Sequence, residues 1–135
     1  CELENCEFDG GSISECVLRD CRVPSGIQVG GKCEFVGGSV GVALSEVRLV
    51  LSSTCELTFD NVEMSRRQIF FFINYEANVT FRRCRMNRAL VLAQSNGTIS
   101  CTGCQLSWAV LPAAANVDAD CTTTNMRRAG VNARV

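Results

Sequence analysis

The sequence contains no histidine, only two prolines, one tyrosine and one tryptophan. Without histidine the chain lacks the commonest general base, the usual partner of a serine or cysteine nucleophile, and a ligand that most zinc sites use. The formal net charge of −1 excludes a generally basic nucleic-acid binder. The longest apolar runs, at residues 69–73 and 89–93, are far shorter than the roughly 20 residues that span a bilayer. We therefore expect no nucleic-acid partner, no membrane span, no metal and no cofactor.

Charge is distributed unevenly along the 135 residues, a length that suits a single domain spanning residues 1–135. Residues 1–64 contain eleven acidic and four basic side chains, whereas residues 65–135 contain three acidic and nine basic ones. The two halves therefore carry net charges of −7 and +6. If the order along the chain is also the order along a rod, this distribution predicts an acidic end and a basic end.

The chain contains an internal repeat. The segment CEFDGGSI at residues 6–13 recurs as CEFVGGSV at residues 33–40. A diverged unit follows, at nearly constant spacing, at residues 58–64, 80–86, 100–106 and 120–126. Within each unit apolar and polar residues alternate on both sides of a bend, which is the period of β-strands. Such short strands cannot bury their apolar side alone, so the units must stack on one another.

Stacked units place equivalent residues in parallel, in-register columns about 4.8 Å apart. The pattern predicts an all-β solenoid of about five coils, each of about 20–29 residues. The first predicted inward column contains Phe8, Phe35, Met64, Met86, Leu106 and Met126. The second contains Leu3, Phe59, Phe81, Cys101 and Cys121.

Two segments, NVTFRRCRM at residues 78–86 and GTISCTGCQL at residues 97–106, resemble the strand-bend-strand coils of right-handed parallel β-helix proteins of the pectin-lyase-like kind. The CEFDGGSI and CEFVGGSV segments are also similar to the Gly-Gly motifs of repetitive β-helical surface proteins. The resemblance implies a right-handed parallel β-helix of the Cys-rich, surface type. Neither end of the sequence shows a cap, so we expect a segment of a longer or polymeric assembly.

The ten cysteines match no zinc-binding spacing. Two readings of them remain open. Inward thiols can fill the columns as small apolar side chains, or stacked pairs can form disulfides, since a Cα separation of about 4.8 Å permits one. The alignment of the repeats places Cys6 over Cys33, Cys84 over Cys104, and Cys101 over Cys121.

Two glycosylation sequons begin at Asn78 and Asn96, each just before a predicted strand. A turn between coils is a position that tolerates a glycan. The sequons and the high cysteine content together favour an extracellular or cell-surface location.

Two groups of side chains are candidate sites. β-Helix enzymes that cleave polysaccharides use clustered carboxylates, and here only Asp118 and Asp120 approach the separation of about 5–9.5 Å that glycoside hydrolysis requires. The side chains of the other group follow each unit at a constant offset. This spacing predicts that they form one surface column, which binds an anionic glycan or packs against a neighbour. Its members are Arg66, Arg88, Trp108 and Arg128. An ordinary charged bend with one exposed tryptophan is the alternative interpretation.

The leading hypothesis is a noncatalytic, extracellular structural or adhesive β-helix. Its acidic N-terminal end and basic C-terminal end would stack head to tail into a filament or continue into more of the same solenoid. The alternative is a carbohydrate-binding or polysaccharide-cleaving β-helix that uses the Arg/Trp column. We do not expect an enzyme.

Overall fold

The computed structural model describes residues 2–7, 11–41, 44–51, 55–73, 77–94, 98–112 and 115–129. These residues form β-strands and no helix, so none of them forms a helix that could cross a membrane. The first sheet contains β1 (Glu2–Glu4), β3 (Val17–Arg19), β6 (Lys32–Val36), β9 (Cys55–Asp60), β11 (Ala77–Arg82), β13 (Thr98–Thr102) and β15 (Asn116–Val117). The second contains β2 (Ser12–Ser14), β5 (Ile27–Gly30), β8 (Glu46–Leu51), β10 (Gln68–Ile73), β12 (Leu90–Gln94), β14 (Val110–Pro112) and β16 (Arg127–Ala129). A small pair joins β4 (Arg22–Val23) to β7 (Ser39–Val40).

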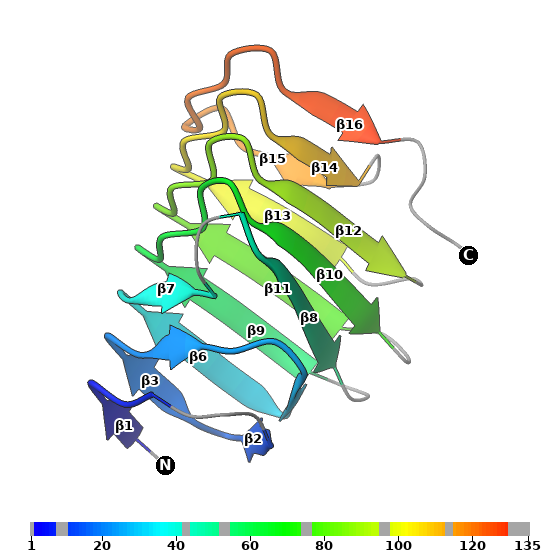
Figure 1. Cartoon of the computed structure of the whole chain (residues 1–135). Coiled ribbons are helices and arrows are strands. Elements are labelled where there is room, and N and C mark those ends of the chain that lie inside the picture. The colour runs from blue at the N-terminus through cyan, green and yellow to red at the C-terminus, as the bar shows by residue number, and fades with distance from the viewer. Residues whose placement is uncertain are drawn as a thin grey trace.

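Each of these strands pairs with its neighbours in parallel, and the strand order of both sheets follows the sequence. From β8 onward, the chain crosses from one sheet to the other and returns one strand further along (Figure 1). Alternate side chains of each strand point between the sheets, which explains the alternation of buried and exposed residues in β8 and β11. The all-β, parallel architecture predicted from the repeat is confirmed.

The step from one strand of the first sheet to the next varies in length. Its central column contains Leu3, Leu18, Phe35, Phe59, Phe81, Cys101 and Val117. The first two steps and the last are shorter than the coil length predicted from the repeat. In the first two, the strands of the second sheet have only three and four residues, whereas β8 and β10 have six.

The phenylalanine side chains form the centre of the core. Phe59 lies between Phe35 and Phe81, with ring centroids 5.1 and 5.3 Å apart and interplanar angles of 12° and 11°. Phe71 of β10 packs against Phe59 from the opposite sheet at 6.4 Å. All four rings are buried, so this cluster joins three repeats and both sheets into one core.

The two predicted inward columns need correction. Phe35 pairs with Phe59 and not with Met64, and Val117 takes the place predicted for Cys121. Met126 directly precedes β16, whose Arg127 pairs with Val110, so it does not continue the column of Leu106. Phe8 lies outside the described residues. These errors have one cause, because the alignment assumed a constant offset between repeats whose lengths differ.

Two rows of bends turn the chain, and both use the left-handed backbone region. The row that follows the first sheet contains Asn5, Asp20, Gly37, Asn61, Arg83 and Gly103, with φ between 54° and 71°. The other row contains Leu44, Arg66, Arg88, Trp108 and Asn125, with φ between 54° and 65°. In that second row each bend is held by the next repeat, since the backbone N–H of Arg66 donates to Asn87 at 2.9 Å and that of Arg88 to Ser107 at 2.8 Å. The backbone therefore fixes the spacing of the side chains at these bends.

Candidate functional site

The second row of bends carries most of the predicted Arg/Trp column. The structure brings Arg66, Arg88 and Trp108 together, as the constant offset predicted. Two further members were missed, Leu44 at one end and Asn125 at the other, because their offsets from the preceding strand differ. We call the row of Leu44, Arg66, Arg88, Trp108 and Asn125 the bend column.

Arg128 does not belong to the bend column. It is part of β16, where it pairs with Leu111 of β14. The N–H of Trp108 donates to the carbonyl of Thr124, which puts Asn125 in the position predicted for Arg128. The last repeat reaches its bend earlier than the others, so the offset counted from Met126 was wrong. Asparagine is enriched in left-handed bends, and that preference was the available sequence signal.

The side chains of the bend column are open to solvent. Leu44 is 83% exposed and Trp108 52% exposed, and they are the exposed large apolar residues of the described chain. Arg66 and Arg88 are also exposed, and neither forms an ion pair within the described residues. Six other arginines do form one: Arg19, Arg22, Arg48, Arg67, Arg83 and Arg85. The column therefore gathers apolar surface and unneutralised positive charge.

A shallow hollow of about 370 Å³ lies beside the column. It is lined by Leu44, Arg66, Arg67, Gln68, Arg88 and Leu90. Arg67 is buried, and its guanidinium donates to the carbonyls of Val40 at 3.0 Å and Ser65 at 2.8 Å. Burial lowers the pKa of Arg67, an effect that Glu63, 3.7 Å away, opposes. Arg67 thus holds the bend in place, whereas Arg66 and Arg88 form no ion pair within the described residues.

The bend column places bulky residues in a strained backbone region. Trp108 has a φ of 59° and Leu44 a φ of 65°, values that cost a residue other than glycine roughly 1–2 kcal/mol. Strain of this kind is often found at ligand-binding positions. At this bend the indole of Trp108 and the isobutyl group of Leu44 lie at the surface, so burial in the core does not offset the backbone strain.

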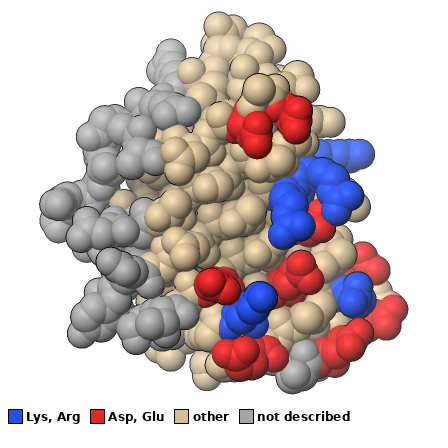
Figure 2. Space-filling view, turned by 180° about the vertical axis from the view of Figure 1, so that it is seen from behind, with Lys and Arg blue, Asp and Glu red and all other residues tan. Residues whose placement is uncertain are grey.

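The acidic N-terminal end and the basic C-terminal end stay a prediction, and the described part of the last repeat carries both signs of charge. Arg66 and Arg88 lie in the middle repeats, and in the last repeat Asp118 and Asp120 accompany Arg127 and Arg128. In Figure 2 the charged side chains gather along the right edge and over the lower part of the face, with further acidic side chains below its uncharged upper end. The acidic N-terminal end is retained in Glu2, Glu4 and Glu7.

Asp118 and Asp120 lie on an exposed turn. Asp118 follows β15, and Ala119 and Asp120 form the turn itself. All three residues are exposed, and none of them is part of a strand. The arrangement lacks the buried environment that tunes a general acid.

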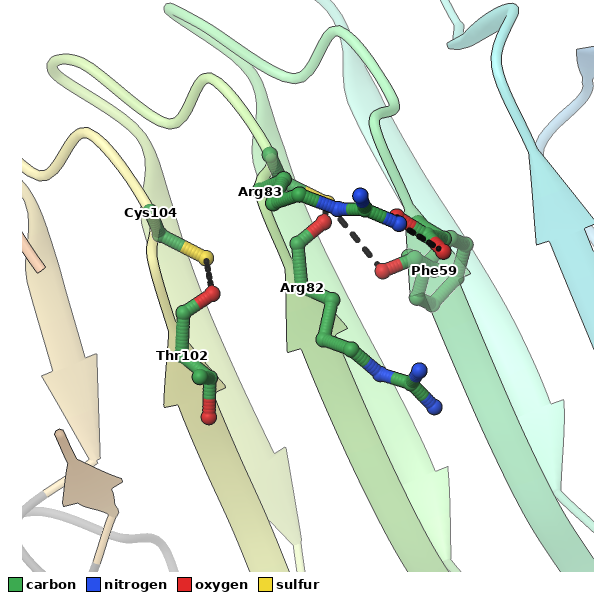
Figure 3. A network of polar contacts seen from close by, with 7 residues as sticks. Phe59, Arg82, Arg83, Thr102 and Cys104 are labelled. Atoms are coloured by element: carbon green, nitrogen blue, oxygen red, sulfur yellow. Dashed lines mark hydrogen bonds and ion pairs between the residues drawn. The ribbon is translucent and has the colours of Figure 1, made fainter. Parts of the chain in front are cut away.

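Asp60 is the buried carboxylate of the described chain. Arg83 donates to both of its oxygens, with three contacts of 2.7–3.0 Å (Figure 3). These hydrogen bonds raise the pKa of the Arg83 guanidinium. Because the carboxylate is fully occupied, it stabilises the bend and is not available as an acid or base.

The cysteines stack differently from the predicted alignment. Cys84 does lie beside Cys104, because Arg85 bridges to Gln105. Cys6 lies beside Cys21 and not Cys33, since Glu7 bridges to Arg22. The nine described cysteines are Cys6, Cys16, Cys21, Cys33, Cys55, Cys84, Cys101, Cys104 and Cys121, and all are free thiols in the structure.

The structure also corrects the neighbours predicted for Cys33 and Cys101. Cys33 pairs with Leu57, and Cys101 pairs with Val117 and not with Cys121. Cys121 instead lies beside Cys104, because Gln105 bridges to Thr122. The alignment had matched the repeated CEF segments, which occupy different places in the two repeats.

Three cysteine thiols contact the backbone of the preceding repeat. Cys84 donates to the carbonyl of Phe59, Cys104 to that of Phe81, and Cys121 to that of Cys101, each at 3.3 Å. Cys104 also contacts the carbonyl of Thr102 at 3.6 Å (Figure 3). Hydrogen bonding to Cys104 and burial raise the pKa of Cys84 and Cys101. The Cys84 and Cys101 thiols therefore remain protonated at neutral pH.

Of the two sequons, the structure describes one. Asn78 is exposed in β11 and not at a turn, and Asn96 lies outside the described residues.

No family model, curated protein or solved structure was found to match the chain. The bend column and its surroundings are therefore the basis of the proposed function.

Proposed function

We propose that this chain is a noncatalytic, extracellular adhesive β-helix whose bend column binds an anionic polysaccharide. The single observation that carries this proposal is the bend column itself. From four repeats it gathers the two large apolar residues that are exposed in the described chain and two arginines that form no ion pair there. The parallel strand order supports a solenoid of the pectin-lyase-like kind, and right-handedness follows because about 98% of parallel crossovers have that hand. The extracellular location rests on the cysteine content and on exposed Asn78.

The chemistry of the column suits a linear, negatively charged ligand. A guanidinium binds carboxylate or sulfate through two parallel hydrogen bonds. The flat indole of Trp108 offers a surface on which a sugar ring can stack. Successive bends lie about 4.8 Å apart, so the column is a ridge along the strand-pairing direction and not a closed cavity. A polymer can contact several repeats at once, whereas a small ligand would contact one or two.

The first prediction compares two charge-neutralised variants. We expect Arg66→Gln combined with Arg88→Gln to weaken binding of dextran sulfate about tenfold, because each exposed ionic contact contributes about 0.2–1 kcal/mol. Arg82→Gln, which removes one charge, is the control for the single variants Arg66→Gln and Arg88→Gln. Arg82 is also exposed and unpaired within the described chain, but it lies on β11 outside the column. Binding is measured by isothermal titration calorimetry against neutral dextran as the blank.

Two results would contradict this proposal. One is a loss of affinity in Arg82→Gln as large as that in Arg66→Gln or Arg88→Gln alone, which would indicate attraction to net charge alone. The other is equally tight binding of single-stranded DNA of matched charge, which would indicate a general polyanion surface. Trp108→Ala should weaken dextran sulfate binding by removing the stacking surface, with no change in its salt dependence.

We also propose head-to-tail association between copies, because the partly buried apolar residues at the edge of the core lie in its first and last repeats. They are Leu3, Cys6 and Ile13 at one end, and Val117, Cys121 and Met126 at the other. Leu3 and Val117 end the same column of the first sheet. A second copy continuing that column would cover both residues and pair with the outer edges of β1 and β15, which have no partner strand within the described residues.

The register of such a contact predicts its salt dependence. With Leu3 placed over Val117, Glu4 falls beside Asp118 and the two carboxylates repel by about 1 kcal/mol. We expect Asp118→Asn to strengthen association several-fold at low salt, and by less at high salt, where this repulsion is screened. Asp20→Asn, an exposed change in the second repeat, should have no effect. Sedimentation velocity showing a monomer at all concentrations and salts would contradict the contact.

A further inference from the structure

The residues that directly follow the bends of the first sheet form a row of their own, and this row carries cysteine at both of its ends. Reading across the repeats, this row contains Cys6, Cys21, Gly38, Val62, Cys84, Cys104 and Cys121. Glycine and valine occupy the middle. The first and last repeats have a neighbour on one side only within the described chain, so they are the least stable part of a stack. Cysteines therefore lie where a covalent link would stabilise the stack most.

The same contact recurs at the two ends. The backbone N–H of Cys6 donates to Sγ of Cys21 at 3.3 Å, and that of Cys104 donates to Sγ of Cys121 at 3.4 Å. In each pair the sulfur of the later repeat lies against the backbone of the earlier cysteine. Neighbours in register have Cα atoms about 4.8 Å apart, within the roughly 4.4–6.8 Å that a disulfide needs. A disulfide brings the two Cβ atoms to about 3.5–4.5 Å, so closing each pair takes a side-chain rotation and a small approach of the two repeats.

Exposure distinguishes these pairs from the other thiols of the row. Cys6 and Cys121 are partly exposed, whereas Cys84 and Cys104 are fully buried. A dissolved oxidant therefore meets Cys6 and Cys121 first. The buried partner of Cys121 is well suited to the second step, because hydrogen bonds from Cys101 and Cys84 lower the pKa of Cys104.

We propose that Cys6–Cys21 and Cys104–Cys121 are oxidation sites that form disulfides and lock the two terminal repeats. The oxidant is a small-molecule disulfide such as oxidised glutathione. The thiolate of Cys6 or Cys121 attacks one of its sulfurs, which gives a mixed disulfide and releases one glutathione. Cys21 or Cys104 then attacks the mixed disulfide, forms the protein disulfide and releases the second glutathione. The two protons lost by the protein end on the two glutathione thiols.

The test uses the reduced full chain, folded and incubated with oxidised glutathione. Remaining thiols are blocked with iodoacetamide, and linked peptides are mapped by mass spectrometry. We expect Cys6–Cys21 and Cys104–Cys121 peptides, and a rise in melting temperature of roughly 5 °C or more. Amide exchange should slow in β1 and β15 on oxidation. The readouts need no glycan, so failure of the glycan proposal leaves them unaffected.

Variants separate the two links. Cys121→Ser should lose the C-terminal link and keep the N-terminal one, and Cys84→Ser should keep both. A map dominated by Cys84–Cys104 or Cys101–Cys104 would overturn the proposal. So would folded protein that forms no disulfide under conditions in which the unfolded chain does, or oxidation without a rise in melting temperature. The wild-type map is decisive even if a variant fails to fold.

Discussion

Replacing Phe59 with alanine is expected to destabilise the folded protein by about 3–5 kcal/mol. Phe59 is fully buried, stacks on Phe35 and Phe81, and contacts Phe71 of the opposite sheet. The neighbouring rings belong to parallel strands whose spacing the backbone fixes, so they cannot collapse into the cavity. Since a domain of this size has a free energy of unfolding of about 5–15 kcal/mol, the loss is a large part of the total. Urea unfolding followed by circular dichroism measures it.

A phenylalanine at the edge of the core provides the control. Phe70 of β10 is only half-buried, and its neighbours in sequence, Ile69 and Phe71, point into the core. Phe70→Ala should cost well under half as much as Phe59→Ala, because the removed ring leaves no enclosed cavity. Equal losses in the two variants would show that the stacked rings do not form the centre of the core.

Gly38→Ala is expected to destabilise the protein by about 2–5 kcal/mol, although it adds a single methyl group. Gly38 has a φ of +73°, and a Cβ there would lie 2.8 Å from the backbone nitrogen of Cys21 and closer still to the Cys21 carbonyl oxygen. Both atoms belong to the preceding repeat, so the clash pushes two repeats apart and cannot be relieved by a side-chain rotation. The melting temperature and the urea midpoint report the loss.

Gly26→Ala separates the clash from the backbone strain. Gly26 has a φ of +89°, and no heavy atom lies within 4 Å of the position of its Cβ. This variant should therefore lose only about 1 kcal/mol, the cost of placing alanine in that backbone region. If Gly26→Ala and Gly38→Ala proved equally unstable, close contact between the repeats at Gly38 would be refuted.

The all-β architecture and part of the site could be predicted from the sequence. Alternating apolar residues and repeated bends predicted parallel stacking, and constant spacing in the middle repeats predicted several columns correctly. Phe59, Phe81 and Cys101 share a column as expected, as do Arg66, Arg88 and Trp108. In these repeats successive steps are nearly equal in length, so a count along the chain is also a register.

Only the tertiary structure decided the register of the outer repeats. Backbone pairing requires every repeat to rise by one strand spacing, whatever the number of residues it contains. Differences in the number of residues per repeat are taken up by the bends and by the lengths of the strands. Residues at unequal separations along the chain therefore still lie side by side. That freedom places Cys21 beside Cys6, brings Leu44 and Asn125 into the bend column, and moves Arg128 out of it. Hydrogen bonds between repeats fix these neighbours, and spacing along the chain does not record them.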